Sequence, residues 1–545
     1  MATPIPDSLE RLSQSDLIGV VRDLIGEVGR LRAENEKLSD ALTKLKAEHQ
    51  AAKDELARLK KLPLRPPQKP SGMDKATDGD GGRDKSPAGE ASRRRRGSQL
   101  DKLTIGATVI VRAQAPAGSR HKGYEDIVVQ DLNLSPQVTL YRRERWETPD
   151  GLRIIAELDP GIVGGYGPNL HRFVLALHIS GQVTCERIVA LLNGMGVVIS
   201  KRQVVRLLTV KLETFRAEDA AVLEAGLTGA YVTADDTGAR HAGKSGYTTQ
   251  IGADTFTVFR TGASKSRLAF LSRLCGSTAF YVINEAALGY MRDRQLPQAV
   301  IDKFAEHEER IFSCPEAWER HLQALGLTDL KVSPDPVLIA SEGALWGAIR
   351  HQGLLANTVV VSDDAGQFRV GVHALCWVHA ERLVHKLVPA NDRQRNAIEV
   401  AKRMIWWFYR CLKQYKLAPC PQQAQVLRAR FDRIFKRSAT GYVMLDRLLR
   451  RLFRHKEALL RVLDRPEIPL NTNASENDIR AFVTKRKISG GTVSLKGRDA
   501  RDIMLGLAKT CMKLNLSFYD FLGARLGIPG TQIPPLAGLI RPAPS

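Results

Sequence analysis

Two short apolar segments of the chain each run into a pair of aspartates. The segment Tyr-Val-Thr-Ala leads into Asp235 and Asp236. The segment Thr-Val-Val-Val-Ser leads into Asp363 and Asp364, and a third acid, Glu476, opens a later helical segment. Two-metal phosphoryl transfer needs about three converging carboxylates, because its two divalent ions activate the attacking oxygen and stabilise the leaving one. Mg²⁺ suits such a site, since it takes oxygen ligands. The pattern therefore indicates phosphoryl transfer by one acid from each pair together with Glu476.

Each acid also has a structural interpretation that the spacing leaves open. An aspartate before a glycine commonly closes an Asx-turn, which would suit Asp236 before Gly238 and either member of the second pair. Asn473 and Glu476 match a capping box, with Asn473 as N-cap and Glu476 at N3. An unpaired carboxylate in a core costs several kcal/mol, so each acid needs a partner under either interpretation.

A sheet and a helix must position these acids. The segment 246–262 contains two further strand patterns, which with 231–240 predict a meander, and 358–362 predicts another strand. Adjacent strand ends would bring two carboxylates together, and a helix laid across the sheet would supply the third. Residues 266–350 and 380–465 have helical patterns, and the second segment is heavily basic. The expected fold class is α/β, with helical insertions.

The N-terminal region predicts a coiled coil followed by a linker. Residues 17–62 carry heptads with Leu at most d positions and Asn35 at an a position, a combination that favours a parallel dimer in fixed register. A single amphipathic helix packed on its own protein is the alternative. Residues 63–99 are rich in Pro, Gly, Ser and charge and predict a flexible linker. The dimerisation residues are Leu24, Leu31, Asn35, Leu38 and Leu45.

The charge of the chain points to a polyanion partner. Lys and Arg number 81 against 59 Asp and Glu, a net charge of +22, and nucleic acid is the commonest partner of such a protein. A helix at about 184–193 ends at Gly194, and Ser200 caps a second helix, which indicates a helix-turn-helix. Two short helices joined by a glycine turn are common in other proteins as well. The second helix presents four polar candidates for DNA contact, namely Lys201, Arg202, Gln203 and Arg206.

Cysteine usage and hydropathy predict a protein of a reducing compartment. The seven cysteines are scattered without any CxxC spacing, so neither a disulfide framework nor a zinc ribbon is expected. No basic leader with an apolar stretch opens the chain, and no apolar run reaches 18 residues. We expect a cytoplasmic, nucleoid-associated protein without membrane contact.

The order of the motifs resembles the transposases of the insertion-sequence-66 (IS66) family, which carry a DDE triad on an RNase H-like fold. The family's Asp-Glu-Thr run is matched by Asp235-Asp236-Thr237 with one conservative change. Its second acid precedes an aromatic residue by five positions, as Asp363 precedes Phe368. The remaining matches are Cys376-Trp377-Val378-His379-Ala380 with Arg382, and Glu476 followed by Ile479-Arg480 and Arg486-Lys487. The resemblance covers about 166–520.

The resemblance implies catalytic and metal-binding roles for Asp235, Asp363 and Glu476, with Asp236 and Asp364 outside the triad. It implies two Mg²⁺ ions, for which Mn²⁺ would substitute. DNA contacts would come from Cys376, His379, Arg480, Arg486 and Lys487. The expected partners are double-stranded DNA, both element ends and target, and a second copy of the chain in a homodimer or higher oligomer. Small accessory proteins encoded by the same element are further candidates.

The expected architecture combines these elements with one departure from the family. Residues 100–160 contain no Cys, so the family's Cys-rich zinc module is replaced by a β-rich module without thiolate ligands. The expected domains are a coiled coil (1–62), a linker (63–99), a small β-rich module (100–165), a helix-turn-helix region (166–225), the RNase H-like core in two parts (226–379, with a helical insertion at about 270–345, and 469–525), a basic helical insertion (380–468) and a Pro-rich tail (526–545).

Two other functions remain possible on sequence grounds. A catalytically silent, transposase-derived DNA-binding repressor would bind the element ends without cutting them. An RNase H-like nuclease would cut DNA but join nothing. Nicking and strand-transfer assays separate these functions from a transposase.

Overall fold

The computed structural model describes residues 104–540, apart from gaps at 115, 117, 160, 277–279, 331 and 437–439, together with some positions between 18 and 34. The chain divides into two units, Met1–Ala76 and Thr77–Ser545. In the first unit, residues 25–31 are helical and exposed, and Leu31 is one of them. The other dimerisation positions, Leu24, Asn35, Leu38 and Leu45, lie outside the described residues, so the coiled coil stays a prediction.

The second unit begins with a stretch that has little regular structure. Two short strands, β1 (Arg145–Glu147) and β2 (Arg153–Ile155), form an antiparallel hairpin. Between 104 and 144 the apolar side chains are exposed, as at Val111 (87 %) and Val138 (92 %). Alternating apolar residues form a stable sheet only where another surface covers one face, and the described residues provide no such cover here. In the described part of the chain, this hairpin is therefore all that represents the β-rich module expected over 100–165.

Three helices follow and share a small core of their own. They are α3 (Pro168–Ile179), α4 (Cys185–Gly194) and α5 (Lys201–Thr209). Ser200 caps α5 by accepting a hydrogen bond from Gln203 N at 3.3 Å, as its sequence predicts. The buried residues of this three-helix cluster are Val174, Ile188, Leu192, Ile199, Val204 and Leu207. The helices lie where the sequence places them, while binding of DNA by α5 stays a prediction.

A mixed five-stranded sheet forms the centre of the unit. Its strands are β3 (Tyr231–His241), β4 (Lys244–Gly252), β5 (Thr257–Gly262), β8 (Val359–Ser362) and β9 (Val372–Leu375). Their order in the sheet is β5-β4-β3-β8-β9. The first three strands form an antiparallel meander, and β8 and β9 run parallel to β3. Together with its helices, this sheet is compatible with an RNase H-like α/β core.

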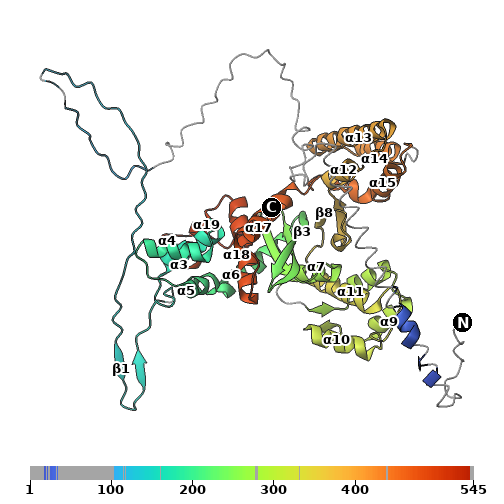
Figure 1. Cartoon of the computed structure of the whole chain (residues 1–545), viewed down its shortest axis with the longest axis horizontal. Helices are drawn as coiled ribbons and strands as arrows, with labels where there is room; N and C mark the ends of the chain where they lie inside the picture. The colour runs from blue at the N-terminus through green and yellow to red at the C-terminus, as the bar shows by residue number, and fades with distance from the viewer. Residues whose placement is uncertain are drawn as a thin grey trace. The chain divides into compact units, whose positions relative to one another are not determined.

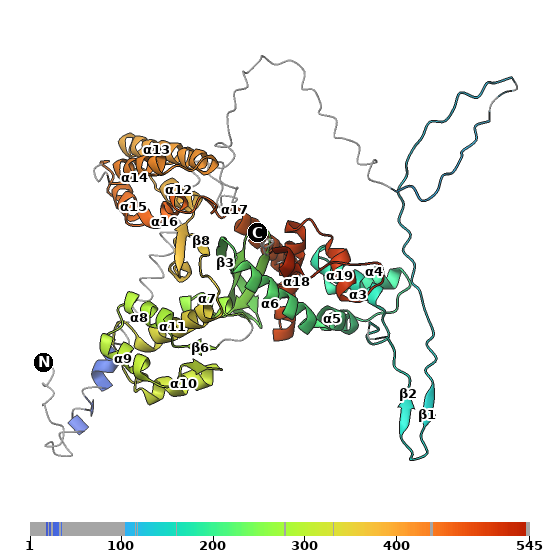
Figure 2. The ribbon, with the colours of Figure 1, turned by 180° about the vertical axis from the view of Figure 1, so that it is seen from behind.

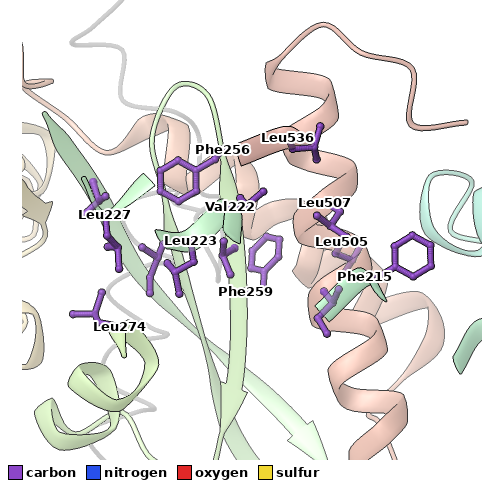
Figure 3. Close-up of a cluster of buried hydrophobic side chains, with 14 of the residues drawn as sticks. Phe215, Val222, Leu223, Leu227, Phe256, Phe259, Leu274, Leu505, Leu507 and Leu536 are labelled. Carbon is purple, nitrogen blue, oxygen red and sulfur yellow. The ribbon is translucent and has the colours of Figure 1, made fainter. Parts of the chain in front are cut away.

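Helices cover both faces of the sheet (Figures 1 and 2). On one face, α17 (Asn473–Ser489) packs on β3 and β4, and α18 (Leu495–Lys513) packs on β5 beside α6 (Leu212–Gly226). On the other face lie α7 (Arg267–Leu274) and α11 (Pro336–His351). The apolar core between α6, the sheet and α18 is built from residues far apart in sequence, including Phe215, Phe259 and Leu505 (Figure 3).

The chain between β5 and β8 forms a mostly helical subdomain, where the sequence predicts an insertion. Its elements besides α7 and α11 are β6 (Tyr281–Val282), α8 (Glu285–Asp293), α9 (Gln298–Glu306), β7 (Ile311–Phe312) and α10 (Pro315–Ala324). Strands β6 and β7 pair antiparallel. Trp318 stacks on Tyr281 and Phe304 in a core separate from that of the sheet.

A second helical insertion separates β9 from α17. Its elements are α12 (Trp377–His385), α13 (Asp392–Leu417), α14 (Pro421–Phe435), α15 (Val443–Arg454), α16 (Lys456–Leu459) and the 3₁₀ turn η4 (Arg461–Leu463). The aromatic run on α13 is partly core: Phe408 and Tyr409 are buried, and Phe408 packs against Trp377. Trp407 is exposed, with the Arg430 guanidinium 5.4 Å from its ring centre.

The end of the chain returns to the core. After α18 come α19 (Phe518–Arg525), which packs on α3, and α20 (Leu536–Ile540), which packs on α6. Leu536 is fully buried, and its backbone N–H donates to Glu218 Oε1 at 2.8 Å. The tail expected over 526–545 therefore contributes to the fold at least as far as α20. Among the described residues, no helix is both long and apolar enough to cross a membrane.

Candidate active site

Asp235 and Asp363 lie on neighbouring parallel strands. Thr233 of β3 pairs with Val361 of β8, and continuing this register by two residues places Asp235 beside Asp363. Residues paired in a parallel sheet point to the same face. The hydrogen bonds that the two carboxylates accept come from backbone groups: Asp236 N donates to Asp235 at 2.8 Å, and Ala365 N donates to Asp363 at 3.0 Å. Both carboxylates are half-buried at the end of the sheet.

Helix α17 brings Glu476 to the same face. The hydroxyl of Ser475, which is fully buried, contacts the hydroxyl of Thr233 at 2.6 Å, and Thr233 shares a face with Asp235 two residues further along β3. This contact fixes the first turn of α17 over β3, close to Asp235. Sequence alone suggested a capping box here, but the helix begins at Asn473 with Thr472 as its N-cap residue. The capping-box interpretation is wrong, because the Glu476 carboxylate turns away from the helix end toward a cation.

That cation is Arg382 of α12. Its Nη1 donates to Glu476 Oε1 at 2.6 Å and its Nη2 donates to Oε2 at 3.1 Å, a bidentate pair. His379 Nε2 lies 3.8 Å from the same carboxylate, one turn earlier on the helix. In the described part of the chain, no three His, Cys, Asp or Glu side chains are arranged so that they could hold a metal ion. The bidentate pair with Arg382 occupies both oxygens of Glu476.

The electrostatics show that the three acids affect one another. Burial raises the pKa of Asp235 to about 6, and the negative charges of Asp363 and Glu476 act in the same direction. Burial alone would lower the pKa of His379, but the neighbouring Cys376 and the charge of Asp363 outweigh it and raise that pKa to about 9. The site therefore combines three acids with a protonated histidine and an arginine.

The second member of each aspartate pair is held elsewhere. Asp236 faces the α7 side of the sheet, where it accepts hydrogen bonds from Thr249 Oγ1 and, at 3.0 Å, from Gln367 Nε2. Asp364 accepts hydrogen bonds from Arg369 and from Arg451 of α15.

Asp364 thus ties β8 to the second helical insertion. His455 Nε2 lies 3.5 Å from its Oδ1, so three cationic or potentially cationic groups surround this one carboxylate. Burial would raise the pKa of Asp364, but the hydrogen bonds from the two arginines outweigh burial and lower it. These contacts give Asp364 a structural role and leave Asp363 as the acid that faces Asp235.

Comparison with known proteins identifies the family. The family model described as "Transposase IS66 family" matches residues 357–500, a segment that contains Asp363, the Cys376–His379 motif and Glu476. The "Uncharacterized protein y4jO" of Sinorhizobium fredii (strain NBRC 101917 / NGR234) is 56 % identical over 320 residues, which are 58 % of this chain and 99 % of that protein. The chain belongs to the IS66 transposase family. No solved structure matches it. The resemblance seen in the sequence is thus confirmed, although Asp235 lies outside the segment that the family model matches.

The residues that the sequence assigned to DNA contact in this IS66-family chain differ in accessibility. Arg202 and Arg206 of α5 are exposed and Gln203 is half-buried, whereas Lys201 forms an ion pair with Glu186. Cys376 is only 2 % exposed, so its predicted contact with DNA is not compatible with this structure.

The remaining predicted contacts lie on α12 and α17. The His379 side chain is 28 % exposed, and that of Arg480 is 40 % exposed with its Nη2 3.9 Å from Glu476. Arg486 is half-buried and Lys487 is exposed near the end of α17. Accessibility permits contact with DNA at these four positions, and the contacts themselves stay predictions.

Sequence reasoning missed the role of Arg382. The residue appeared only as part of the family motif, although its position three residues after His379 places both side chains on one face of α12. That spacing was a usable signal for a cation next to the site. The contact of Asp364 with Arg451 could not be found in this way, because the two residues are 87 positions apart.

Proposed function

We propose that this IS66-family protein is a DDE transposase that cuts and joins DNA with Asp235, Asp363 and Glu476. The observation that carries the proposal is the register of β3 and β8, which sets Asp235 beside Asp363 while Asp236 and Asp364 are bound by other side chains. Membership of a transposase family supports the same activity and implies DNA as partner. The N-terminal heptads would join two copies.

The donor set of these three carboxylates fits Mg²⁺ or Mn²⁺. All the donors are carboxylate oxygens, which suit hard divalent cations. The raised pKa of Asp235 reflects burial first and then the nearby negative charges, and these charges are what bound cations would neutralise. When bound, two such ions would stabilise the charge on the attacking and leaving oxygens of a phosphodiester. Glu476 would join this set only after it exchanges Arg382 for a cation.

The protein's own residues would prepare the site for that exchange. Arg382 and His379 keep the Glu476 carboxylate beside the two aspartates and offset the repulsion among the three acids. Once released, the Arg382 guanidinium would remain close to the reacting phosphate, where its planar donors match phosphate oxygens.

The reaction would proceed in two displacements at phosphorus. Water attacks the phosphodiester at the element end, the bond to the 3′ oxygen breaks, and a free 3′-hydroxyl results. That hydroxyl then attacks a target phosphodiester and forms a new phosphorus–oxygen bond, while the 3′ oxygen of the target strand leaves. No bond between protein and DNA forms, because the nucleophiles are water and a DNA hydroxyl.

A plasmid assay tests this proposal. A supercoiled plasmid that carries both element ends is incubated with the protein and Mg²⁺, and nicked, excised and joined products are separated. Asp235→Asn, Asp363→Asn and Glu476→Gln should each abolish product formation while DNA binding survives. Binding without nicking by the wild-type protein would indicate the silent repressor, and nicking without joined products would indicate the nuclease.

A further inference from the structure

A pocket lined by four arginines lies at the far end of β3 from the strand start. It is formed where β3, the C-terminal half of α17 and the first turns of α18 meet, on the face of the sheet that α17 and α18 cover. Its arginines are Arg240, Arg486, Arg498 and Arg501, and its other lining residues are Ala239, Thr261, Phe482, Thr492 and Asp502. None of Arg240, Arg498 and Arg501 was singled out by the sequence.

The positive charge of this arginine pocket is only partly balanced by its own acid, because the single charge of Asp502 acts on both Arg498 and Arg501. Asp502 is buried, and its two oxygens accept hydrogen bonds from Thr261 N at 2.6 Å and Thr261 Oγ1 at 3.0 Å, so they are directed into the protein. Among the described residues, no carboxylate pairs with the guanidinium of Arg486 or Arg240. The pocket therefore holds an excess of positive charge that an anion would stabilise.

The other two arginines are already oriented by hydrogen bonds. Arg498 pairs with Asp499 at 3.0 Å, and Arg501 Nη1 donates to the carbonyl of Gly490 at 3.0 Å. Both stand on the first two turns of α18, whose N-terminus carries partial positive charge.

The frame around the pocket is held rigidly in place. The backbone of Thr492 is hydrogen-bonded to that of β3 on both sides, with Thr492 N donating to Arg240 O at 3.0 Å and Ala242 N donating to Thr492 O at 2.7 Å. A Cβ atom at Gly491 would lie 2.6 Å from Arg240 O, so only glycine permits this approach. A guanidinium held on fixed elements loses less conformational freedom when it binds a ligand.

Two independent elements give the distance from the pocket to the proposed catalytic acids. Ala239, which lines the pocket and shares a face of β3 with Asp235, follows Asp235 by four residues of strand, which is about 13 Å. Arg486 follows Glu476 by ten residues of helix, which is about 15 Å. Base pairs of B-DNA rise about 3.4 Å each, so this distance corresponds to roughly four or five base pairs.

We infer that the arginine pocket binds a backbone phosphate of duplex DNA about four or five base pairs from the phosphodiester held at the carboxylates. Guanidinium groups match phosphate oxygens in bidentate geometry, and contacts to phosphate fix the register of a protein on DNA without reading its sequence. The position relative to the cut rests on the proposed function, whereas the phosphate site itself does not. A free phosphate ion has the same chemistry, so the experiment must separate the two sources.

The primary test measures affinity for a 30-base-pair duplex of arbitrary sequence across a salt series, without divalent cations. Arg486→Gln should weaken binding about tenfold and reduce the salt slope by about one. Arg320→Gln, an exposed arginine on α10, is the control and should bind as the wild type does. Thermal melting of each variant shows that it is folded, and Arg486→Lys should recover part of the affinity, since it restores the charge without the planar donors.

A second arm separates the sources of the phosphate. Inorganic phosphate is added to the wild type and to Arg486→Gln while the melting temperature is recorded. Stabilisation by phosphate that is lost in the variant, together with unchanged affinity for DNA, would identify a free-phosphate site and overturn binding of the DNA backbone. Unchanged DNA affinity without any effect of phosphate would make the pocket purely structural and would also overturn the inference.

A third arm tests the number of base pairs between the phosphate in the pocket and the cut. After the nick on the plasmid has been mapped, duplexes with a neutral methylphosphonate at each of the neighbouring positions are compared. The substitution four or five positions from the nick should weaken binding by the wild type and have no further effect on Arg486→Gln. If the triad variants still nick DNA while Arg486→Gln loses affinity, the proposed catalytic residues are wrong and the phosphate site stands. If a methylphosphonate weakens binding at none of these positions, the inferred distance between the pocket and the cut is wrong.

Discussion

Asp363→Asn should change mainly the activity, and Asp364→Asn mainly the stability. Asp363 faces Asp235, and its charge is one of the causes that raise the pKa of Asp235. Asp364 instead accepts hydrogen bonds from Arg369 and Arg451, with His455 nearby. Asp363 thus repels Asp235 and attracts His379, two effects that oppose each other, whereas the partners of Asp364 are cationic or potentially cationic groups.

The expected magnitudes follow from these contacts. The pKa of Asp235 rises from 3.8 to about 6, and a shift of this size corresponds to roughly 3 kcal/mol. Burial is the largest cause of this shift, and the attraction between Asp363 and His379 opposes the repulsion between Asp363 and Asp235, so Asp363→Asn should change the stability by less than about 1 kcal/mol without metal. The Asp364→Asn variant should lose about 1–2 kcal/mol, because its charged hydrogen bonds become neutral and the arginine partners are partly exposed.

The assay combines melting with plasmid nicking. In metal-free buffer at neutral pH, Asp363→Asn should melt within about 2 °C of the wild type and Asp364→Asn a few degrees below it. With Mg²⁺ and a plasmid carrying the element ends, Asp363→Asn should nick at least three decades more slowly, since it loses a ligand from a two-metal site. Asp364→Asn should keep its rate within about tenfold below its melting temperature.

The opposite pattern would refute this reasoning. If Asp364→Asn melts as the wild type does and fails to nick, while Asp363→Asn nicks normally, then the register at the end of β8 is off by one residue. If Asp363→Asn loses as much stability without metal as Asp364→Asn does, then Asp363 has a structural role like that of Asp364.

Three further predictions rest on other parts of the chain. Arg382→Gln should lower the melting temperature without metal and enlarge the upward shift caused by Mn²⁺, because the arginine no longer competes for Glu476; an unchanged Mn²⁺ shift would contradict this. Burial lowers the pKa of His171 from 6.5 to about 4. Between these two pH values the unfolded chain binds a proton at His171 and the folded chain does not, so the free energy of unfolding should fall as the pH drops below 6.5. The loss at pH 5 should be about 2 kcal/mol in urea unfolding, and His171→Gln should remove that part of the pH dependence. Deletion of residues 1–62 should convert a dimer to a monomer in sedimentation, and an unchanged mass would refute the coiled coil.

Much of the local structure could be predicted from the sequence. Ser200 and the glycine at 194 set the ends of α4 and α5, since capping and helix termination depend on residues within one turn. The start of β3 was likewise predictable from its β-branched and aromatic residues, but the prediction that the strand ends at Asp235 was wrong, because β3 continues to His241 in its pairing with β4. The apolar alternation between 104 and 144 indicates a possible sheet face but not the surface that would have to cover it, so the β-rich module stays a prediction.

The partners of the acids could not be predicted, because they come from distant segments. Glu476 sits near a helix start, where local rules favour a capping box, yet a bidentate arginine 94 positions earlier in the chain binds it instead. Arg382 gives Glu476 two hydrogen bonds from a cation, whereas a capping box would give it one from a backbone N–H, so the tertiary contact prevails over the local preference. No spacing rule connects the two residues unless the sheet and both helices are already in place.

The alternation of a β-strand explains why Asp235 and Asp236 have different roles, and the contacts of Asp363 and Asp364, which follow the end of β8, divide the second pair in the same way. Successive side chains point to opposite faces, so Asp235 faces α17 while Asp236 faces the α7 side, where Thr249 and Gln367 bind it. Each pair thus supplies one carboxylate to the proposed site and one to the frame that holds the strand end. On this argument the second aspartate is not a spare catalytic residue, and exchanging the two roles would require the whole strand to shift by one residue.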